Sequence, residues 1–288
     1  MKKLIVGLLT AATALIVAIA PAAAITKNYV KDFEHPFVGL IAFYDDAGEF
    51  SHRCSGSLLT PTVFLTAGHC TDDGEGGVMP SARIWFRQDA GTRFDGTIDP
   101  VTGYPEACLA GPCTTAHEMY NFGFDNFAGF PNTRDAGLVI LDEPIIVAEY
   151  ASLASAGTLS GLHEQRGLQD ITFTVSGYGL SYSSPVRVVS FRERLMAEAK
   201  LVNVKGGLNK GFNLQTMGNG AGRGGTCSGD SGGPVFYPST SNTIVAVTSF
   251  GLNAWCRGVD FAYRTDQQAV IDWILDNAGD AADDIVID

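Results

Sequence analysis

Ser231 lies in a glycine-rich stretch whose composition favours nucleophilic chemistry. The stretch reads Gly225-Thr226-Cys227-Ser228-Gly229-Asp230-Ser231-Gly232-Gly233-Pro234 and precedes an apolar run. Glycine permits a positive φ, so these residues allow a tight turn that presents the serine hydroxyl ahead of a strand. The N–H groups of Gly229 and Ser231 are then expected to face the group under attack, as an oxyanion hole requires.

A serine nucleophile needs a base, and the chain offers few. Its histidines are His35, His52, His69, His117 and His163. His69 ends the run Phe64-Leu65-Thr66-Ala67-Gly68-His69-Cys70, a β-type segment that closes in small residues. An imidazole titrates near neutral pH, which makes these histidines, His69 among them, candidates for the general base. His117 lacks a surrounding ligand pattern and is expected on the surface rather than on a metal.

Together these two segments resemble the trypsin/chymotrypsin-like serine proteases. Leu65–Cys70 carries the histidine motif and Gly229–Pro234 the serine motif, in the order that the family has. The resemblance covers nearly the whole chain after the first two dozen residues. It implies an all-β fold of two packed six-stranded antiparallel β-barrels with a C-terminal α-helix. It also implies a serine endopeptidase that works through an acyl-enzyme, without metal or organic cofactor.

The carboxylate that orients the base is expected at Asp135. It heads the apolar run 136–141, which matches the family's aspartate followed by a hydrophobic strand. A buried aspartate bonded to Nδ1 of His69 would fix the tautomer and stabilise the imidazolium. Asp125 is the alternative, but it has no strand behind it to hold it rigid.

Six cysteines permit three disulfides in an exported protein. The resemblance implies that Cys54 pairs with Cys70 beside the histidine. It also implies that Cys227 pairs with Cys256 beside the serine. Cys108 and Cys113 then remain as a third pair, which would close a small loop.

Residues 1–24 have the features of a secretory signal peptide. Lys2 and Lys3 precede an apolar run, and Ala22-Ala23-Ala24 offers a small-residue cleavage site. A retained membrane anchor is the alternative. We expect a secreted monomer, free of the membrane. Its protease domain over 25–288 would comprise a first barrel at 25–150, a linker and second barrel at 151–264, a helix at 265–279 and a frayed acidic tail at 280–288.

Cleavage after Ala24 would make Ile25 the first residue. In the resembling family a freed isoleucine amino group pairs with the aspartate beside the nucleophile, here Asp230. Breaking such a buried ion pair costs about 3–5 kcal/mol. The family's Ile-Val-Gly-Gly start is absent here, so the alternative is that Asp230 caps its own loop.

Short apolar runs separated by turn residues predict the strands. They lie at 38–44, 56–59, 63–66 and 82–86 in the first half, and at 171–179, 186–189, 195–204 and 244–251 in the second. A helix is predicted from Thr265 to Gly279, with Thr265 or Asp266 as its cap. The long segment between Arg87 and Thr133 is expected to form surface loops near the cleft. Its four phenylalanines are expected to pack under the loop, with substrate subsites as the alternative; they are Phe122, Phe124, Phe127 and Phe130.

The resemblance also assigns a substrate pocket. Ser249-Phe250-Gly251 would bind the substrate as an added strand, whatever its side chains. Gly225 and Thr226 would form the pocket floor, with Gly251 and Gly258 as its walls. Trypsin's pocket aspartate would fall at Gly225, so an open pocket favours a large apolar side chain. Asp260 is the alternative, because an acid two residues past Gly258 can point the same way and would select Arg or Lys.

Other classes of protein fit the sequence less well. The formal net charge of −12 disfavours nucleic acid as a partner, because phosphate binding needs a basic surface. Gly229–Gly233 also fits the G-x-S-x-G of α/β-hydrolase esterases, but their histidine follows the serine and none follows Ser231. A zinc protease would need H-E-x-x-H, which is absent. A non-catalytic binding protein on a protease scaffold would be expected to have lost one of His69, Asp135 and Ser231.

Overall fold

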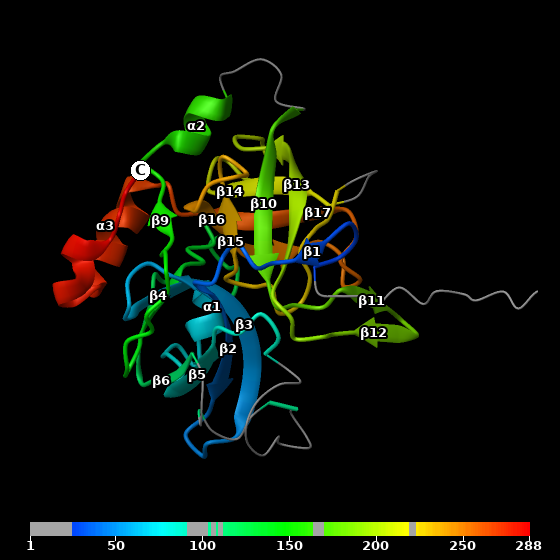
Figure 1. Cartoon of the computed structure of the whole chain (residues 1–288). Helices are drawn as coiled ribbons and strands as arrows, with labels where there is room; N and C mark the ends of the chain where they lie inside the picture. The colour runs from blue at the N-terminus through cyan, green and yellow to red at the C-terminus, as the bar shows by residue number, and fades with distance from the viewer. Residues whose placement is uncertain (1–24, 91–102, 105–107, 109–111, 164–169, 219–222) are drawn as a thin grey trace, which may run out of the picture.

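A computed structural model describes residues 25–90, 103, 104, 108, 112–163, 170–218 and 223–288. Figure 1 shows two β-rich bodies, with the sheet that holds β2, β3 and β5 below the sheet that holds β10, β13 and β16. Helices α2 and α3 lie on the left-hand side of this view, whereas the short α1 lies where the two bodies meet. The expected all-β class with a C-terminal α-helix is confirmed.

The first sheet has the strand order β6-β5-β2-β3-β4-β8-β7, with every neighbouring pair antiparallel. Its strands are β2 (Val38–Tyr44), β3 (Phe50–Leu58), β4 (Val63–Thr66), β5 (Ser81–Trp85), β6 (Cys113–Ala116), β7 (Glu118–Asn121) and β8 (Gly137–Ile140). Only His117 separates β6 from β7. Because β6 pairs with β5 and β7 pairs with β8, this one bent segment joins the two ends of the sheet. The sheet thereby closes as a barrel with six strand positions.

The second sheet closes through a pairing of β13 with β14. The ring runs β13-β10-β15-β16-β17-β14, which gives six strands. These are β10 (Thr172–Gly177), β13 (Leu195–Asn203), β14 (Asn213–Met217), β15 (Pro234–Phe236), β16 (Thr243–Gly251) and β17 (Val259–Arg264), while β9 (Ser152–Leu153) adds in parallel beside β16. The two six-stranded barrels expected from the resemblance are therefore present.

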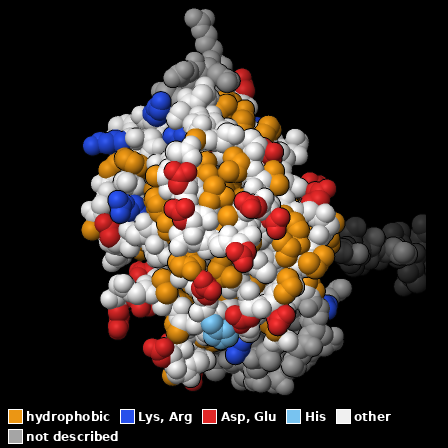
Figure 2. Space-filling model, turned by 90° about the vertical axis from the view of Figure 1, so that its left-hand side faces the viewer, with side chains coloured by type: hydrophobic (Ala, Val, Ile, Leu, Met, Phe, Trp, Pro, Cys, Tyr) orange, Lys and Arg blue, Asp and Glu red, His pale blue; other side chains and the backbone are white. Residues whose placement is uncertain are grey.

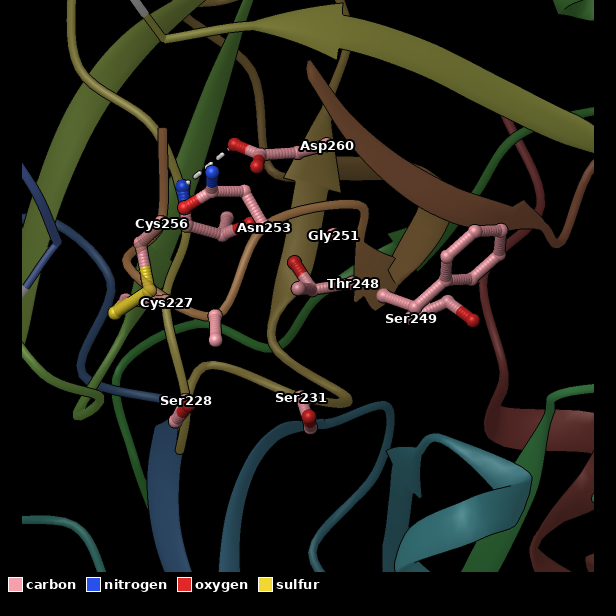
Figure 3. Close-up of a pocket in the computed structure, with 12 residues that line it drawn as sticks. Cys227, Ser228, Ser231, Thr248, Ser249, Gly251, Asn253, Cys256 and Asp260 are labelled. Atoms are coloured by element: carbon pink, nitrogen blue, oxygen red, sulfur yellow. Dashed lines mark hydrogen bonds between the residues drawn. A yellow bond between two sulfur atoms is a disulfide. The ribbon is translucent and has the colours of Figure 1, made fainter. Parts of the chain in front are cut away.

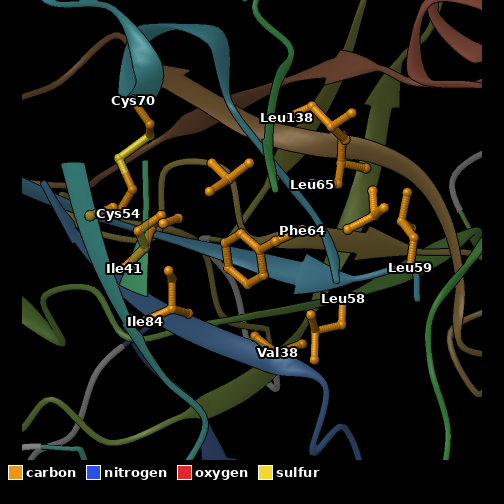
Figure 4. Close-up of a cluster of buried hydrophobic side chains, with 14 of the residues drawn as sticks. Val38, Ile41, Cys54, Leu58, Leu59, Phe64, Leu65, Cys70, Ile84 and Leu138 are labelled. Carbon is orange, nitrogen blue, oxygen red and sulfur yellow. A yellow bond between two sulfur atoms is a disulfide. The ribbon is translucent and has the colours of Figure 1, made fainter. Parts of the chain in front are cut away.

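The core of the first barrel explains why its strands form where they do. All seven residues of β2 are buried, and the neighbouring strands contribute large apolar side chains to the same cluster. Figure 4 shows Phe64 at the centre of this cluster, among Ile41, Leu58, Ile84 and Leu138. Removing this apolar surface from water is the main force that holds the strands together.

Three expectations about the chain path were wrong. The segment between Arg87 and Thr133 does not form only surface loops, because it contributes β6 and β7 to the first barrel. Val186–Val189 does not continue the second barrel: β12 (Arg187–Val189) pairs only with β11 (Tyr182–Ser184), in a separate hairpin. The first barrel also does not begin at residue 25, because β1 (Val30–Lys31) pairs with β13 of the second sheet. Val186 is 95% exposed, so the hairpin has no core to join.

The C-terminal segment is more ordered than expected. Helix α3 spans Gln268–Asn277, and Gln267 precedes it without a side-chain cap. Thr265 and Asp266 are not the cap, because the Asp266 carboxylate accepts from Arg264 and from the N–H of Leu159 at the start of α2 (Thr158–His163). The tail is not frayed. Residues 279–284 form a 3-10 helix, Ile285 is buried, and the N–H of Leu153 donates to the carbonyl of Val286.

Candidate active site

His69 and Asp135 are brought together by the pairing of two strands. His69 lies on α1 (Gly68–Thr71), directly after β4, and Asp135 lies just before β8. Since Thr66 pairs with Gly137 across β4 and β8, the two side chains start from adjacent strand ends. His69 Nδ1 lies 2.9 Å from Asp135 Oδ2, and the N–H of His69 donates to Oδ1 at 2.7 Å. Asp125, the alternative carboxylate, lies in the turn before Ala128 instead.

The pair has the electrostatics of an imidazole held by a buried anion. Burial raises the pKa of Asp135, but the charge of His69 and the hydrogen bonds that Asp135 accepts outweigh it and lower the pKa below its usual value. Burial lowers the pKa of His69, but the charge of Asp135, the hydrogen bond to it and the charge of Asp72 raise it above the ordinary value. The carboxylate therefore stays ionised, and the imidazole is a stronger base than free histidine.

Ser249 supports Asp135 in a way that the sequence analysis missed. Its hydroxyl donates to Asp135 Oδ2 from β16, a strand of the other barrel. This contact gives Oδ2 of a fully buried carboxylate a hydrogen bond in addition to the one with His69, and it couples the two barrels at the site. Ser249 precedes an apolar residue near the end of a strand, and nothing in this local sequence indicates such a contact.

Ser231 lies on the turn between Cys227 and β15. Gly229 has φ of 95°, which a residue with a Cβ rarely adopts. The N–H groups of Asp230, Gly232 and Gly233 donate to the carbonyls of Cys227, Thr248 and Asp230. Within the described residues, those of Gly229 and Ser231 have no protein acceptor.

Ser55 holds this turn against the first barrel and was also missed. Its N–H donates to the carbonyl of Ser231 at 2.8 Å, and its hydroxyl donates to the carbonyl of Gly229 at 2.8 Å. The same hydroxyl accepts from the N–H of Tyr178. Ser55, a buried residue of β3, therefore holds the Ser231 turn against the first barrel through both its N–H and its hydroxyl.

His69 and Ser231 line one cleft of about 680 Å³ between the barrels. One of its walls is aromatic. The ring centroid of Phe124 lies 5.8 Å from that of His69, and Phe127 packs edge-on between Phe124 and Phe250. Phe124 and Phe127 thus face the cleft rather than only packing under the loop, whereas Phe122 packs against Trp273 of α3 and Phe130 against Phe250.

A deeper cavity of about 200 Å³ opens beside Ser231. Figure 3 shows Ser231 at one end and Asp260 at the other, with the Cys227–Cys256 disulfide along one side. Asp260 Oδ2 accepts from the N–H of Thr226 at 2.9 Å. Burial raises the pKa of Asp260 to about 6, although the hydrogen bonds from Thr226 act against it. The cavity therefore ends in a carboxylate that is charged at neutral pH.

The predicted pocket residues separate into two sets. Thr226, Ser249, Phe250, Gly251 and Asp260 line the cavity. Gly225 and Gly258 are not in its lining. Gly225 lies behind Asp260, because a Cβ there would come within 2.7 Å of Asp260 Oδ2. The absence of a side chain at 225 is what makes room for the acid at 260.

The disulfides pair Cys54 with Cys70, Cys108 with Cys113, and Cys227 with Cys256. Within the described residues, the one His and Cys group close enough for a metal ion is Cys54, Cys70 and His69. Its two cysteines are bonded to each other and offer no thiolate.

Asp230 is buried beside the Ser231 turn. Its carboxylate accepts from the N–H groups of Cys227 and Gly179, at 2.9 and 2.7 Å. Burial raises its pKa to about 7, and the hydrogen bonds and the charge of Arg53 offset only part of this. Ile25 is fully buried, and Thr26 and Gly225 exchange backbone hydrogen bonds. The segment that starts at Ile25 is therefore bonded at Thr26 to Gly225, five residues before Asp230.

Comparison with known proteins gives the family. The trypsin family model matches residues 28–274. The chain therefore belongs to the trypsin family, and it is a serine endopeptidase. Among its relatives, brachyurin of Leptuca pugilator is 29% identical over 247 residues, covering 82% of this chain and 91% of the relative. Fibrinolytic enzyme, isozyme C, of Lumbricus rubellus is 26% identical over 251 residues, covering 81% and 91%.

Solved structures share the fold. HL collagenase superposes with a TM-score of 0.60 at 19% identity, over 85% of this chain and 94% of that one. A scabies mite inactivated protease paralogue gives 0.58 at 18% identity, over 85% and 93%. Human heparin binding protein gives 0.57 at 19% identity, over 89% and 97%. Because one of these is named as inactivated, the fold alone does not specify catalysis, which depends on the residues of the site.

Proposed function

We propose that this protease cleaves peptide bonds through an acyl-enzyme formed on Ser231. His69 takes the proton of the Ser231 hydroxyl as it attacks the carbonyl carbon, and then gives that proton to the leaving amine. Water repeats the cycle and releases the acid product. The observation that carries the proposal is the ionised, buried Asp135 bonded to Nδ1 of His69 in the cleft that Ser231 lines.

The N–H groups of Gly229 and Ser231 would hold the oxyanion. Their support is that neighbouring amides of the turn are bonded within the protein while these two have no acceptor in the described part of the chain. Each donor of this kind contributes about 2.7–4 kcal/mol to transition-state stabilisation in comparable enzymes. An esterase reaction would use the same groups, so ester hydrolysis is expected as a side activity.

A fluorophosphonate probe tests this proposal directly, because it labels only an activated serine. We expect the purified protein to be labelled and Ser231→Ala to be neither labelled nor active, with kcat lower by about 10⁶. Ser239→Ala, in the turn after β15, is the matched control and should label normally. Equal circular dichroism would show that both variants are folded. Labelling that persists in Ser231→Ala, or a wild-type protein that is folded but unlabelled, would contradict the proposal and favour a binding protein.

The substrate pocket is proposed to select Lys or Arg. The sequence favoured a large apolar side chain because Gly225 stands where trypsin has its aspartate. The position of Asp260 at the end of the cavity supports the alternative, since an extended cationic side chain would meet the carboxylate there. The substrate is accordingly a protein or peptide with Lys or Arg before the cleaved bond, bound along Ser249–Gly251.

Secretion and activation are proposed to be one event. Removal of residues 1–24 would free the Ile25 amine, which is proposed to pair with Asp230. Two features support this: Ile25 is fully buried, and burial leaves Asp230 with a raised pKa that a cation would lower. Within the described residues, no helix is long and apolar enough to cross a membrane. The mature protein is proposed to act as an extracellular monomer.

A further inference from the structure

One end of the cleft carries a carboxylate that the proposed chemistry does not use. Asp72 follows α1 directly and lines the same cleft as His69 and Ser231. Its side chain is half-buried and has no hydrogen-bond or ion-pair partner in the described part of the chain. A charge kept at the edge of a cleft without a protein partner is available to a ligand.

The backbone holds Asp72 in place. Its N–H donates to the carbonyl of Gly68 at 3.0 Å, and Asp72 pairs with Val78 as an isolated β-bridge. The N–H of Met79 also donates to the carbonyl of Thr71 at 2.8 Å. The carboxylate therefore moves only by side-chain rotation, so fixing it on a ligand costs little entropy.

The other charged groups at this end are already engaged. Asp73 Oδ1 accepts from the N–H groups of Glu75 and Gly77, at 2.7 and 2.9 Å, and so shapes its own turn. Arg53 donates to the carbonyl of Tyr178 and the hydroxyl of Ser190.

His52 bonds to the carbonyl of Cys70, and burial lowers its pKa, which favours the neutral form. Asp72 is thus the carboxylate at this end that has no hydrogen-bond partner for its side chain in the described part of the chain.

The proposed direction of the bound substrate indicates which half of it would reach the end of the cleft that Asp72 lines. The acyl half is proposed to lie along Ser249–Gly251, beside the cavity that ends in Asp260. The leaving-group half must then pass His69 toward the end lined by residues 51–54 and 72–74. We propose that Asp72 selects Lys or Arg at one of the first two positions after the cleaved bond. This inference rests on the proposed acyl transfer.

Asp72 also acts on the base, which gives a second readout. The groups that influence the pKa of His69 are Asp135 and Asp72, both of which raise it, against burial, which lowers it. His52, the other titratable neighbour, is coupled to His69 electrostatically. Since His69 must be neutral to accept a proton, removing the charge at 72 should move the acid limb of kcat/KM to lower pH. A purely structural role for Asp72 would not shift this limb.

The test compares peptide pairs that share Arg before the cleaved bond and carry either Lys or norleucine at the first or second position after it. Only the product of cleavage after Arg is measured, so that cleavage after the added Lys is not counted. We expect the wild-type protein to prefer Lys by about three- to fivefold in kcat/KM at low salt, with the preference shrinking as salt screens the charge. Asp72→Asn should bring this ratio to about one, and Asp72→Lys should bring it below one. Glu75→Gln removes the same charge from the same loop, outside the cleft lining, and should keep the ratio.

The outcomes separate this inference from the proposed function. A wild-type ratio of one at both positions, or a Lys preference that survives in Asp72→Asn, would overturn the inference while cleavage itself continues. Failure to cleave either peptide, together with failure to label Ser231, would overturn the proposed function instead. The salt dependence of the wild-type ratio needs no variant, so a misfolded Asp72→Asn does not leave the question open. A ratio independent of salt would count against a charged contact.

Discussion

Asp260 is the residue on which the proposed substrate choice depends, and its position explains why the sequence was ambiguous. Trypsin's pocket acid precedes its cysteine by two residues, where this chain has Gly225. The acid here comes instead from β17, and the missing side chain at 225 makes room for it. A sequence shows which residue types are present, but the pairing of β17 with β14 and β16 fixes where Asp260 points.

The charge on Asp260 should make selectivity depend on pH. Its pKa, raised by burial to about 6, means that the carboxyl is protonated below pH 6 and ionised above it. The ratio of kcat/KM for Arg over Leu before the cleaved bond should therefore rise as pH increases through about 6. Protonation of His69 lowers kcat/KM for both substrates equally, so its effect cancels in the ratio.

Asp260→Asn should make that ratio low and independent of pH, with a loss of about thirtyfold or more for the Arg substrate at pH 8. The asparagine Oδ1 can still accept from the N–H of Thr226, so the fold should survive. A wild-type ratio that stays flat between pH 5 and 8 would show that Asp260 does not meet the substrate.

At the scale of elements, the sequence predicted strands best where both faces are buried. β2, β4 and β16 match their expected ranges closely, because continuous apolar runs have few other ways to be buried. The segment 186–189 was wrongly assigned to the second barrel, because its strand pairs in a separate exposed hairpin with β11. Of the site, His69, Asp135 and Ser231 could be chosen from motifs. Ser55 and Ser249 could not, because their contacts cross between barrels.

The C-terminal tail gives a test at this scale. Ile285 is 8% exposed, whereas its neighbour Val286 is 54% exposed. Ile285→Ala should lower the free energy of unfolding by about 2–4 kcal/mol, and Val286→Ala should change it by less than about 0.5 kcal/mol. Chemical denaturation of the two variants measures the difference. Two equally small effects would mean that the tail is frayed in solution, as its acidic composition suggested.

At the scale of the whole molecule, one face shows how charged and apolar side chains are distributed. On the face in Figure 2, acidic side chains are scattered among apolar ones, and basic side chains are fewer. This distribution agrees with the net charge of −12. It fits a role for acidity in solubility better than a large site for one partner.

The proposed activation also concerns the whole chain, because it links residue 25 to a turn two hundred positions later. A protein that begins at Ile25 should exceed one that retains Ala24 by about a hundredfold or more in kcat/KM, since an unpaired buried Asp230 costs about 3–5 kcal/mol. The activity of the Ile25 form should also fall at high pH as its amine loses its proton. N-terminal sequencing of the secreted protein provides the companion measurement. A native start elsewhere, or equal activity of the two forms, would rule the mechanism out.

The hydrogen bonds that Asp288 makes affect where a tag can be attached to this chain. The carbonyl of Asp288 accepts from both the N–H and the hydroxyl of Ser155, and the N–H of Asp288 donates to Leu153. An affinity tag fused directly after this residue would compete with those contacts, and a tag before Ile25 would block the proposed amine. The tip of the β11–β12 hairpin, at Val186, is exposed and lies outside both barrels, so an internal tag or a labelling peptide is best inserted there.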